Sequence, residues 1–201
     1  QILLKKYIGI PPALPLLGLI RWYKFDESAG QVLTDYSGNN AHGQLGGSSG
    51  TDSQDPTWVD GGLSFDGGDQ IIIPGQSLTG AFTVISVNAP AHLVNNYYMG
   101  STLGNVRQGY SASGLYYMRS VPSGFSDTFF GSDLAVDVPR CVTFQRLDDG
   151  TVFCMENDGT PVISAEQTGT ANWEYIGRSP TYYFSGKIYY TLIYDVALAL
   201  K

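Results

Sequence analysis

The stretch Arg21-Trp22-Tyr23-Lys24-Phe25-Asp26-Glu27, followed by the loop from Asp35 to Gly43, decides the fold of this chain. Two blocks of similar composition lie near the other end of the chain, Phe184-Ser185-Gly186-Lys187-Ile188 and Leu192-Ile193-Tyr194-Asp195. Short runs of aromatic and aliphatic residues, bounded by Gly, Ser, Asn and Asp, are typical of β-strands. Both ends of the chain are therefore predicted to contribute strands.

From Leu19 onward the hydrophobic period is two, and no long helical repeat is visible. We expect strands at 19–25, 63–65, 70–73, 81–88, 96–99, 114–118, 141–147, 151–155, 161–164, 173–177 and 183–194. Many short strands with Gly- and Ser-rich turns between them predict an all-β fold, an antiparallel two-sheet β-sandwich of the jelly-roll type. A chain of 201 residues can bury such a core as one domain.

Two further blocks lie between the ends, at 56–67 and at 173–178. In this order and spacing the four blocks resemble strands of laminin-G-like, concanavalin A-like lectin and glucanase domains of bacterial and phage type, over roughly residues 19 to 198. The resemblance implies a concanavalin A-like jelly roll. It implies no single activity, because this fold hosts lectins, adhesion modules, virion proteins and hydrolases.

The charge balance narrows the range of partners. The formal net charge is −7 and the sequence pI is about 4.6, so the surface should repel phosphate backbones and we expect no nucleic-acid partner. The uncharged run from Tyr7 to Ile20 is too short to cross a bilayer, so we also expect no membrane span.

Residues 1 to 18 are predicted to form an extended, apolar and proline-rich N-terminal tail, and residues 19 to 201 the sandwich. Pro11, Pro12 and Pro15 deny this segment a stable helix. Large apolar surfaces rarely stay bare. We therefore expect the tail to dock on neighbouring subunits or virion proteins, with packing on its own domain as the alternative.

Two cysteines flank a hairpin signal. A tight loop that pairs Leu147 with Thr151 also pairs Phe144 with Cys154. Cys141 then lies three residues along the strand from the position that faces Cys154, which is about 10 Å. A disulfide needs Cα atoms within about 7 Å, so both thiols are predicted to be free.

The two faces of this hairpin differ in polarity. The face with Val142, Phe144, Val152 and Cys154 is predicted to line the core, with Arg146 and Glu156 at its ends. The opposite face mixes polar and apolar residues, namely Thr143, Gln145, Thr151, Phe153 and Met155. We expect that second face to be partly open to solvent or to a ligand.

Glycoside hydrolysis is the first enzymatic activity to test. Laminarinase-type enzymes of this fold place carboxylates on one strand face as Glu-x-Asp-x-x-Glu, which sets acid and nucleophile about 5–5.5 Å apart. The nearest run here, Glu156-Asn157-Asp158, lacks the downstream Glu. Neither histidine lies in a nucleophile-elbow context. We therefore expect the chain not to be an enzyme.

The loop from Asp35 to Asn40 supplies carboxylate, hydroxyl, amide and carbonyl oxygens within one turn, and Ca²⁺ takes six to eight such ligands. Members of the resembling family often hold a structural Ca²⁺ where the opening loop meets the last strand. Carried over by position, that site would involve Asp35, Asn40 and Asp195. The alternative is a plain Asx-turn, since these residues form turns whatever they bind.

Tyrosine doublets suggest a ligand surface. On a strand one member of each doublet faces the core and the other faces outward. Outward rings suit stacking on a surface glycan or filling a protein interface, and the alternative is ordinary packing and edge cover. The predicted ligand-binding residues are Tyr97, Tyr98, Tyr116, Tyr117, Tyr182 and Tyr183.

These features together predict a non-catalytic recognition or adhesion module. Free thiols fit assembly in a reducing compartment, so we expect a surface component of a phage virion, such as a tail, head-fibre or decoration protein, with glycan binding as its recognition function. One alternative is a purely structural virion or oligomer protein without glycan binding. The other is a lectin module of a secreted or cell-surface bacterial protein.

Overall fold

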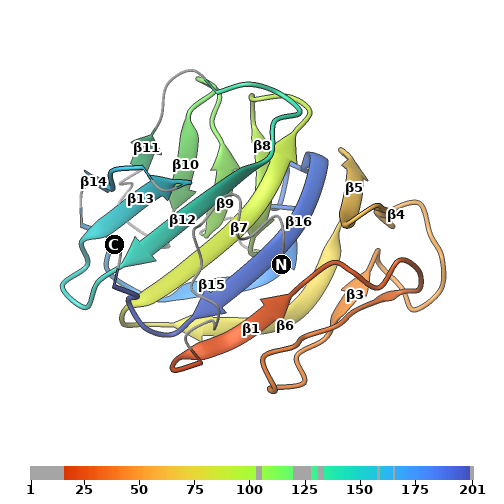
Figure 1. Ribbon diagram of the computed structural model, residues 1–201, viewed down its shortest axis with the longest axis horizontal. Helices are drawn as coiled ribbons and strands as arrows, with labels where there is room; N and C mark the ends of the chain where they lie inside the picture. Colours follow the sequence, from red (N-terminus) through yellow and green to blue (C-terminus); the bar gives the residue numbers. More distant parts are fainter. Residues whose placement is uncertain are drawn as a thin grey trace.

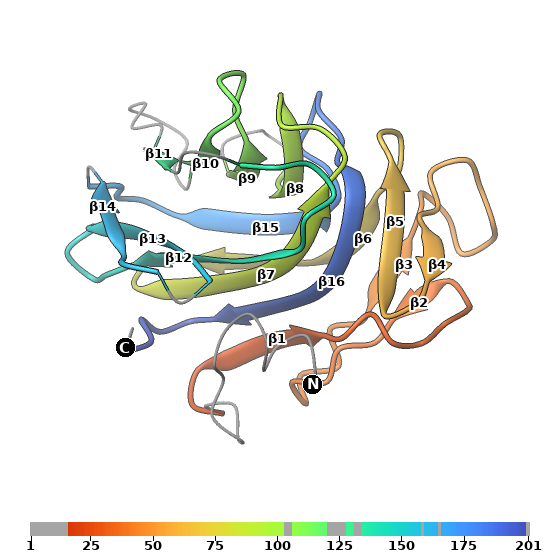
Figure 2. The ribbon, with the colours of Figure 1, turned by 45° about the horizontal axis from the view of Figure 1, so that its top comes forward.

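A computed structural model describes residues 16–102, 106–119, 128–130, 134–157, 159–164 and 166–199. Sixteen strands and no helix are found in these residues (Figure 1). They form two antiparallel sheets that lie face to face, which Figure 2 shows as two layers. The predicted all-β two-sheet sandwich is therefore confirmed. No helix in these described ranges is long and apolar enough to span a membrane.

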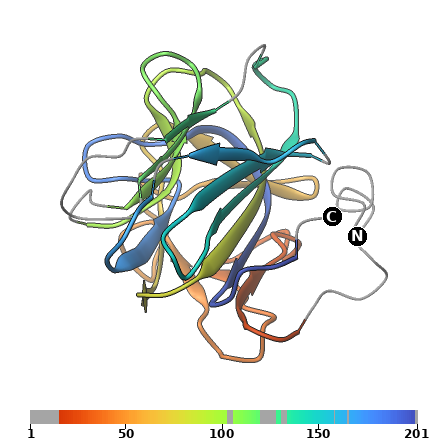
Figure 3. The ribbon, with the colours of Figure 1, turned by 90° about the vertical axis from the view of Figure 1, so that its left-hand side faces the viewer.

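The first sheet has the spatial order β14 (Val162–Ser164), β13 (Val152–Glu156), β12 (Arg140–Arg146), β7 (Phe82–Pro90), β16 (Ser185–Tyr194), β5 (Gly62–Asp66) and β4 (Thr57–Val59), and β1 (Leu19–Tyr23) also pairs with β16. The second sheet has the order β11 (Thr128–Phe130), β10 (Tyr116–Arg119), β9 (Arg107–Tyr110), β8 (Asn96–Gly100), β15 (Ala171–Ile176), β6 (Ile71–Leu78), β3 (Gly43–Leu45) and β2 (Val32–Leu33). Both sheets are visibly twisted, as side-chain sterics require (Figure 3).

The closing strand β16 joins the two ends of the chain. Its first half pairs with β5, where Ile188 faces Leu63, and its second half pairs with β1, where Thr191 faces Tyr23. Along its other edge it pairs with β7. The opening and closing blocks of the sequence are therefore neighbours in the first sheet.

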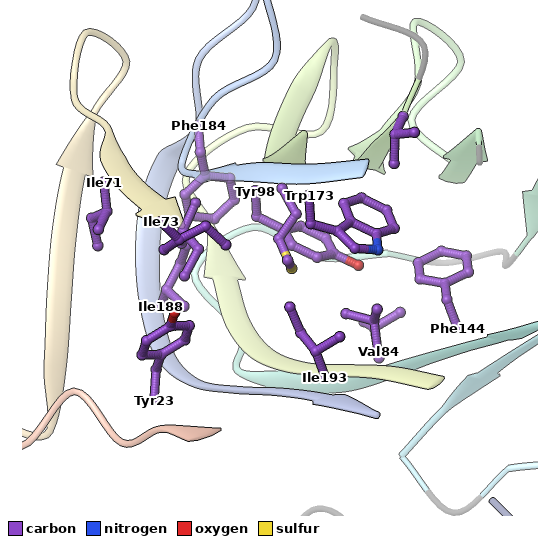
Figure 4. Close-up of a cluster of buried hydrophobic side chains, with 14 of the residues drawn as sticks. Tyr23, Ile71, Ile73, Val84, Tyr98, Phe144, Trp173, Phe184, Ile188 and Ile193 are labelled. Carbon is purple, nitrogen blue, oxygen red and sulfur yellow. The ribbon is translucent and has the colours of Figure 1, made fainter. Parts of the chain in front are cut away.

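The main core lies between the two sheets. Trp173 of β15 meets Phe82 of β7 edge to face, with ring centroids 6.2 Å apart. Figure 4 shows Val84 and Ile193 of the first sheet directed toward Trp173 and Tyr98 of the second. Side chains from both layers thus bury one another, which is the main favourable contribution to folding in a sandwich.

The cysteine hairpin has the predicted register. Phe144 faces Cys154 across β12 and β13, and Cys141 lies at the far end of β12. Both thiols are free and buried. The prediction of two unpaired cysteines is confirmed.

The second face of this hairpin is open on one strand only. Thr151 and Phe153 are partly exposed, as predicted, whereas Thr143 and Gln145 on β12 are buried, which corrects the prediction for those two. The amide of Gln145 donates to the carbonyl oxygen of Leu198 at 2.6 Å, and the hydroxyl of Thr83 donates to that of Val196 at 2.9 Å. The chain that follows β16 therefore crosses this face over β12 and β7 and covers Gln145.

Most of the predicted N-terminal tail, residues 1 to 15, lies outside the described residues. Leu16 and Leu17 are 75% and 84% exposed. Gly18 accepts a backbone hydrogen bond from Asp195 through its carbonyl oxygen at 2.9 Å, next to the start of β1. The proposed division at residue 18 thus stays a prediction.

Candidate functional site: a tyrosine and arginine face of the second sheet

Strand alternation separates the members of two tyrosine doublets. Tyr98 and Tyr116 point into the core between the sheets. Tyr97 and Tyr117, one position away on β8 and β10, point to the outer side of the second sheet. Only the outer members can contribute to a surface.

Register then brings the outer residues together. Across β8, β9 and β10 one row contains Tyr97, Gly109 and Tyr117. The neighbouring row contains Gly100, Arg107 and Arg119. Paired residues of antiparallel strands point to the same side, so the tyrosines and arginines share one face.

Gly109 leaves the centre of the first row, between Tyr97 and Tyr117, without a side chain. A Cβ at this position would overlap the backbone of Asn96 and Tyr97, so only glycine fits. The rings of Tyr97 and Tyr117 meet across it, with centroids 5.5 Å apart and planes at 80°. This edge-to-face arrangement is a favoured geometry for aromatic pairs.

Arg107 lies over both rings. Its guanidinium carbon is 4.9 Å from the Tyr97 centroid and 5.0 Å from the Tyr117 centroid, within cation–π range. Its Nε and Nη2 also donate to the hydroxyl oxygen of Tyr117 at 3.3 and 3.2 Å. The guanidinium is therefore held in a defined orientation while the residue stays partly exposed.

The turn between β15 and β16 extends this face. Ser179 donates its backbone N–H to the carbonyl oxygen of Tyr182 at 2.8 Å, and Gly177 donates to Tyr98 of β8 at 2.8 Å. The turn thereby places the Tyr182 ring 5.4 Å from the Tyr97 ring. Tyr182 is 37% exposed, whereas Tyr97 and Tyr117 are 3% and 2% exposed, so Tyr182 is an accessible ring above a buried aromatic floor.

A second arginine lies beside this cluster. The Arg178 guanidinium carbon is 5.0 Å from the Tyr175 ring centroid and 5.3 Å from the Tyr183 ring centroid. Its Nη1 donates to the side-chain oxygen of Gln70 at 2.5 Å. Tyr175 faces Gly100 across β15 and β8, which joins this group to the row that contains Arg107. We call the whole set the Tyr/Arg face: Tyr97, Arg107, Tyr117, Arg119, Tyr175, Arg178, Tyr182 and Tyr183.

Four of the six predicted ligand-binding tyrosines, Tyr97, Tyr117, Tyr182 and Tyr183, thus gather on one face. The position of Tyr98 and Tyr116 corrects the prediction for those two, because both are buried among the rings of the core. Burial raises the pKa of both phenols well above the ordinary value. Both side chains lie on the core side of the second sheet, opposite to the Tyr/Arg face.

Sequence reasoning missed Arg107, Arg119, Arg178 and Tyr175. Tyr175 and Arg178 lie in the block 173–178, which indicated a strand and no ligand contact, and Arg107 and Arg119 belong to no motif. The spacing of Gly100 and Gly109 along their strands was an available signal, since glycine inside a strand often marks a close approach.

The predicted calcium loop is organised by its own hydrogen bonds. One oxygen of the Asp35 carboxylate accepts the backbone N–H of Trp22 and of Ser37, at 2.9 and 3.0 Å. The other accepts the hydroxyl of Ser37 at 2.8 Å and the N–H of Ala41 at 3.0 Å. Burial alone would raise the pKa of this carboxyl, but these hydrogen bonds outweigh it and hold the pKa below its ordinary value. An Asx-turn accounts for the loop.

The three predicted calcium ligands come from the opening loop and from the segment after β16. Asp35 is held beside Trp22, and the same loop reaches Leu19, which faces Tyr194 next to Asp195, through the amide of Asn39. Calcium binding by these residues stays a prediction. Asn40 is exposed with a left-handed φ of 54°. Across the described ranges no group of three or more His, Cys, Asp or Glu side chains could hold a metal.

No protein-family model matches the sequence. A search of curated proteins gives no match either. Solved structures do match. Domain 4 of a GH43 extracellular arabinanase from Geobacillus stearothermophilus, solved with arabinotriose, has a TM-score of 0.69 at 20% identity, and the match covers 90% of this chain and 94% of that domain.

Sialidase from Trypanosoma rangeli in complex with sialic acid has a TM-score of 0.65 at 16% identity, and the match covers 94% of this chain. A second structure of the same sialidase has a TM-score of 0.64, also at 16% identity, and 96% of this chain is covered. This chain spans about a third of the sialidase, 32% and 33% in the two structures. At such identities the likeness establishes a shared β-sandwich fold alone.

These matches correct the expectation that the chain is not an enzyme. Structures that share its fold belong to a sialidase and an arabinanase, which are enzymes. The expectation rested on a missing carboxylate motif and on two histidines outside a nucleophile-elbow context, and glycoside chemistry has other solutions, such as the tyrosine nucleophile of sialidases. The residue that came nearest to that motif, Glu156, forms an ion pair with Arg140.

Proposed function

We propose that this chain is a glycan-binding module of the laminin-G-like, concanavalin A-like type, and that it binds sugar on the Tyr/Arg face. One observation carries the proposal. The accessible ring of Tyr182 packs on Tyr97, and the guanidinium of Arg107 is fixed over the same aromatic floor.

The chemistry of this arrangement suits a sugar. An exposed tyrosine ring offers a flat apolar surface for the C–H face of a pyranose or furanose, together with a hydroxyl that can hydrogen-bond. Arg107 and Arg178 add N–H donors for sugar oxygens. Contacts between the rings and guanidinium groups restrain these side chains before binding, which lowers the entropic cost of ordering them.

The comparisons support the same class of ligand. An arabinanase domain that this chain covers almost completely was solved with arabinotriose, and the sialidase was solved with sialic acid. Both ligands are carbohydrates. The likeness is one of fold, so the binding surface proposed here rests on the residues of this chain.

A glycan array followed by calorimetric titration of the best ligand tests the proposal. Tyr182→Ala should weaken binding about tenfold, which corresponds to about 1.4 kcal/mol, the value of a well-packed aromatic contact. Tyr36→Ala is the matched control, because Tyr36 is also exposed (39%) but lies in the opening loop beside Lys24. Absence of binding to every glycan, or equal losses in both variants, would contradict the proposal.

A second role concerns assembly. We infer that residues 1 to 18 dock the module on neighbouring subunits, such as those of a virion, with a secreted or cell-surface protein as the alternative setting. The exposure of Leu16 and Leu17 supports this inference, because two adjacent leucines in water favour burial against a partner. Deletion of residues 1 to 16 should leave a folded module and abolish any oligomer seen by light scattering. A stable full-length monomer would count against this role.

A further inference from the structure

We propose that the Tyr/Arg face selects acidic glycans, and that Arg107 is the residue that binds their carboxylate. This inference rests on the proposed function, since it names the class of sugar that the same face would take. It adds a charge requirement that the aromatic rings alone do not impose.

Arg107 is surrounded by neutral partners. Its contacts are the rings of Tyr97 and Tyr117 and the hydroxyl oxygen of Tyr117, all neutral groups. The chain has 18 acidic residues against 11 basic ones. Even so, the described residues provide no carboxylate to Arg107, whereas Arg140 forms an ion pair with Glu156.

The guanidinium of Arg107 is oriented by Tyr117 through two of its three nitrogens. Nε and Nη2 are engaged with Tyr117, and no hydrogen bond is made by Nη1 to any described residue. A planar guanidinium held by stacking presents its remaining N–H groups in a known direction. Charge-assisted hydrogen bonds to a carboxylate are roughly twice as strong as neutral ones.

A second arginine, Arg119, adds positive charge beside Arg107. Arg119 lies at the position directly opposite Arg107 on β10, and its guanidinium carbon is 5.8 Å from the ring of Tyr117. Two guanidinium groups at facing positions raise the local positive potential, which attracts an anionic ligand even to a chain whose overall charge is −7.

The test compares one sugar in two charge states. Oligogalacturonides, and the same oligomers after reduction of their carboxyl groups, are titrated against the intact chain by calorimetry. The acidic form should bind at least about tenfold more tightly, which corresponds to about 1.4 kcal/mol. That preference should shrink between about 50 mM and about 500 mM NaCl, because salt screens exposed charges.

Variants separate charge from shape. Arg107→Gln should remove the preference for the acid while weak binding of the reduced oligomer remains, and Arg107→Lys should keep part of it. Lys187→Gln is the charge-matched control, since Lys187 is exposed on β16 in the other sheet. It should change neither affinity.

The outcomes are distinct. If acidic and reduced oligomers bind the intact chain equally at low salt, the acidic-glycan inference is overturned while the glycan-binding function stands. If neither form binds and the glycan array is also blank, the proposed function itself fails. Should Arg107→Gln not fold, as judged by thermal melting, the ratio of affinities and its salt dependence in the unaltered chain still decide the question.

Discussion

The guanidinium of Arg146 lies 4.7 Å from the centroid of the Phe82 ring, and the two residues face each other across β12 and β7. Arg146 is buried without a carboxylate partner among the described residues. Its charge is instead satisfied by carbonyl oxygens. It donates to Leu78 at 3.0 Å, to Gly80 at 3.0 and 2.8 Å, and to Gly169 at 2.9 Å. One side chain thus ties two loops to the end of the core.

Replacing Arg146 should be strongly destabilising. In Arg146→Met the apolar volume is kept but three carbonyl oxygens lose charged donors, and the free energy of unfolding should fall by roughly 3 kcal/mol. Urea denaturation measures the change, with Lys187→Met on the exposed side of β16 as the control. A loss below about 1 kcal/mol would show that water replaces the guanidinium at those carbonyls.

The opening loop should depend on the ionised carboxylate of Asp35. Its pKa is lowered in the folded chain, so its stabilising contribution is fully present above the ordinary pKa of about 4 and is lost as pH falls through the folded value. Asp35→Ala should cost about 1–3 kcal/mol at neutral pH. Thermal melts of both proteins from neutral to acidic pH should show the gap narrowing below pH of about 4.

Thermal melts with and without EDTA test whether calcium contributes to the stability of the chain. The Asx-turn accounts for the loop by hydrogen bonds alone, so excess EDTA should leave the melting temperature of the unaltered chain unchanged. A bound ion at a hundredfold excess over its Kd would add about 2.7 kcal/mol. A drop on chelation that disappears in Asp35→Ala would restore the calcium hypothesis.

Asp69 should give stability the opposite dependence on pH. Burial raises the pKa of its carboxyl to about 6, and the neighbouring Asp66 carboxylate adds to the shift. Since the folded pKa exceeds the unfolded value of about 4, the folded state binds more protons between them. Stability from this group is therefore greatest below pH of about 4 and is lost as pH rises through about 6.

Asp69→Asn tests this reasoning. In the unaltered chain the backbone N–H of Asp66 donates to Asp69 Oδ2 at 2.7 Å. The side-chain oxygen of an Asn at this position can still accept that hydrogen bond. The variant should melt near the unaltered chain at acidic pH and above it at pH of about 8. A constant difference across this range would mean that Asp69 titrates normally in the folded chain.

Both cysteines should be unreactive until the chain unfolds. Burial raises the pKa of Cys141 to about 12, and it also raises the pKa of Cys154 well above the ordinary value. The thiolate is the reactive form, so both thiols should resist a disulfide reagent in the folded protein. In denaturant without reductant, titration should find two thiols per chain. Rapid modification before unfolding would show that the closing segment exposes Cys141.

Several features follow from local sequence. Period-two hydrophobicity and Gly-rich turns determine the strands, and a tight loop sets the hairpin register that pairs Phe144 with Cys154. Alternation along β8 and β10 also separates Tyr97 from Tyr98 and Tyr117 from Tyr116. These relations involve residues close in the chain, where backbone geometry leaves few choices.

Other features required the tertiary structure. Which strand lies beside which is set by the packing of two whole sheets, so the row that joins Tyr175, Gly100, Arg107 and Arg119 has no signature in sequence. The chain after β16 covers Gln145 and Thr83 for the same reason, since that contact joins segments far apart along the chain. The sequence by itself determined an all-β sandwich with two free thiols and tyrosines of alternating direction. Only long-range strand pairing decided that four of those tyrosines meet three arginines on one outer face.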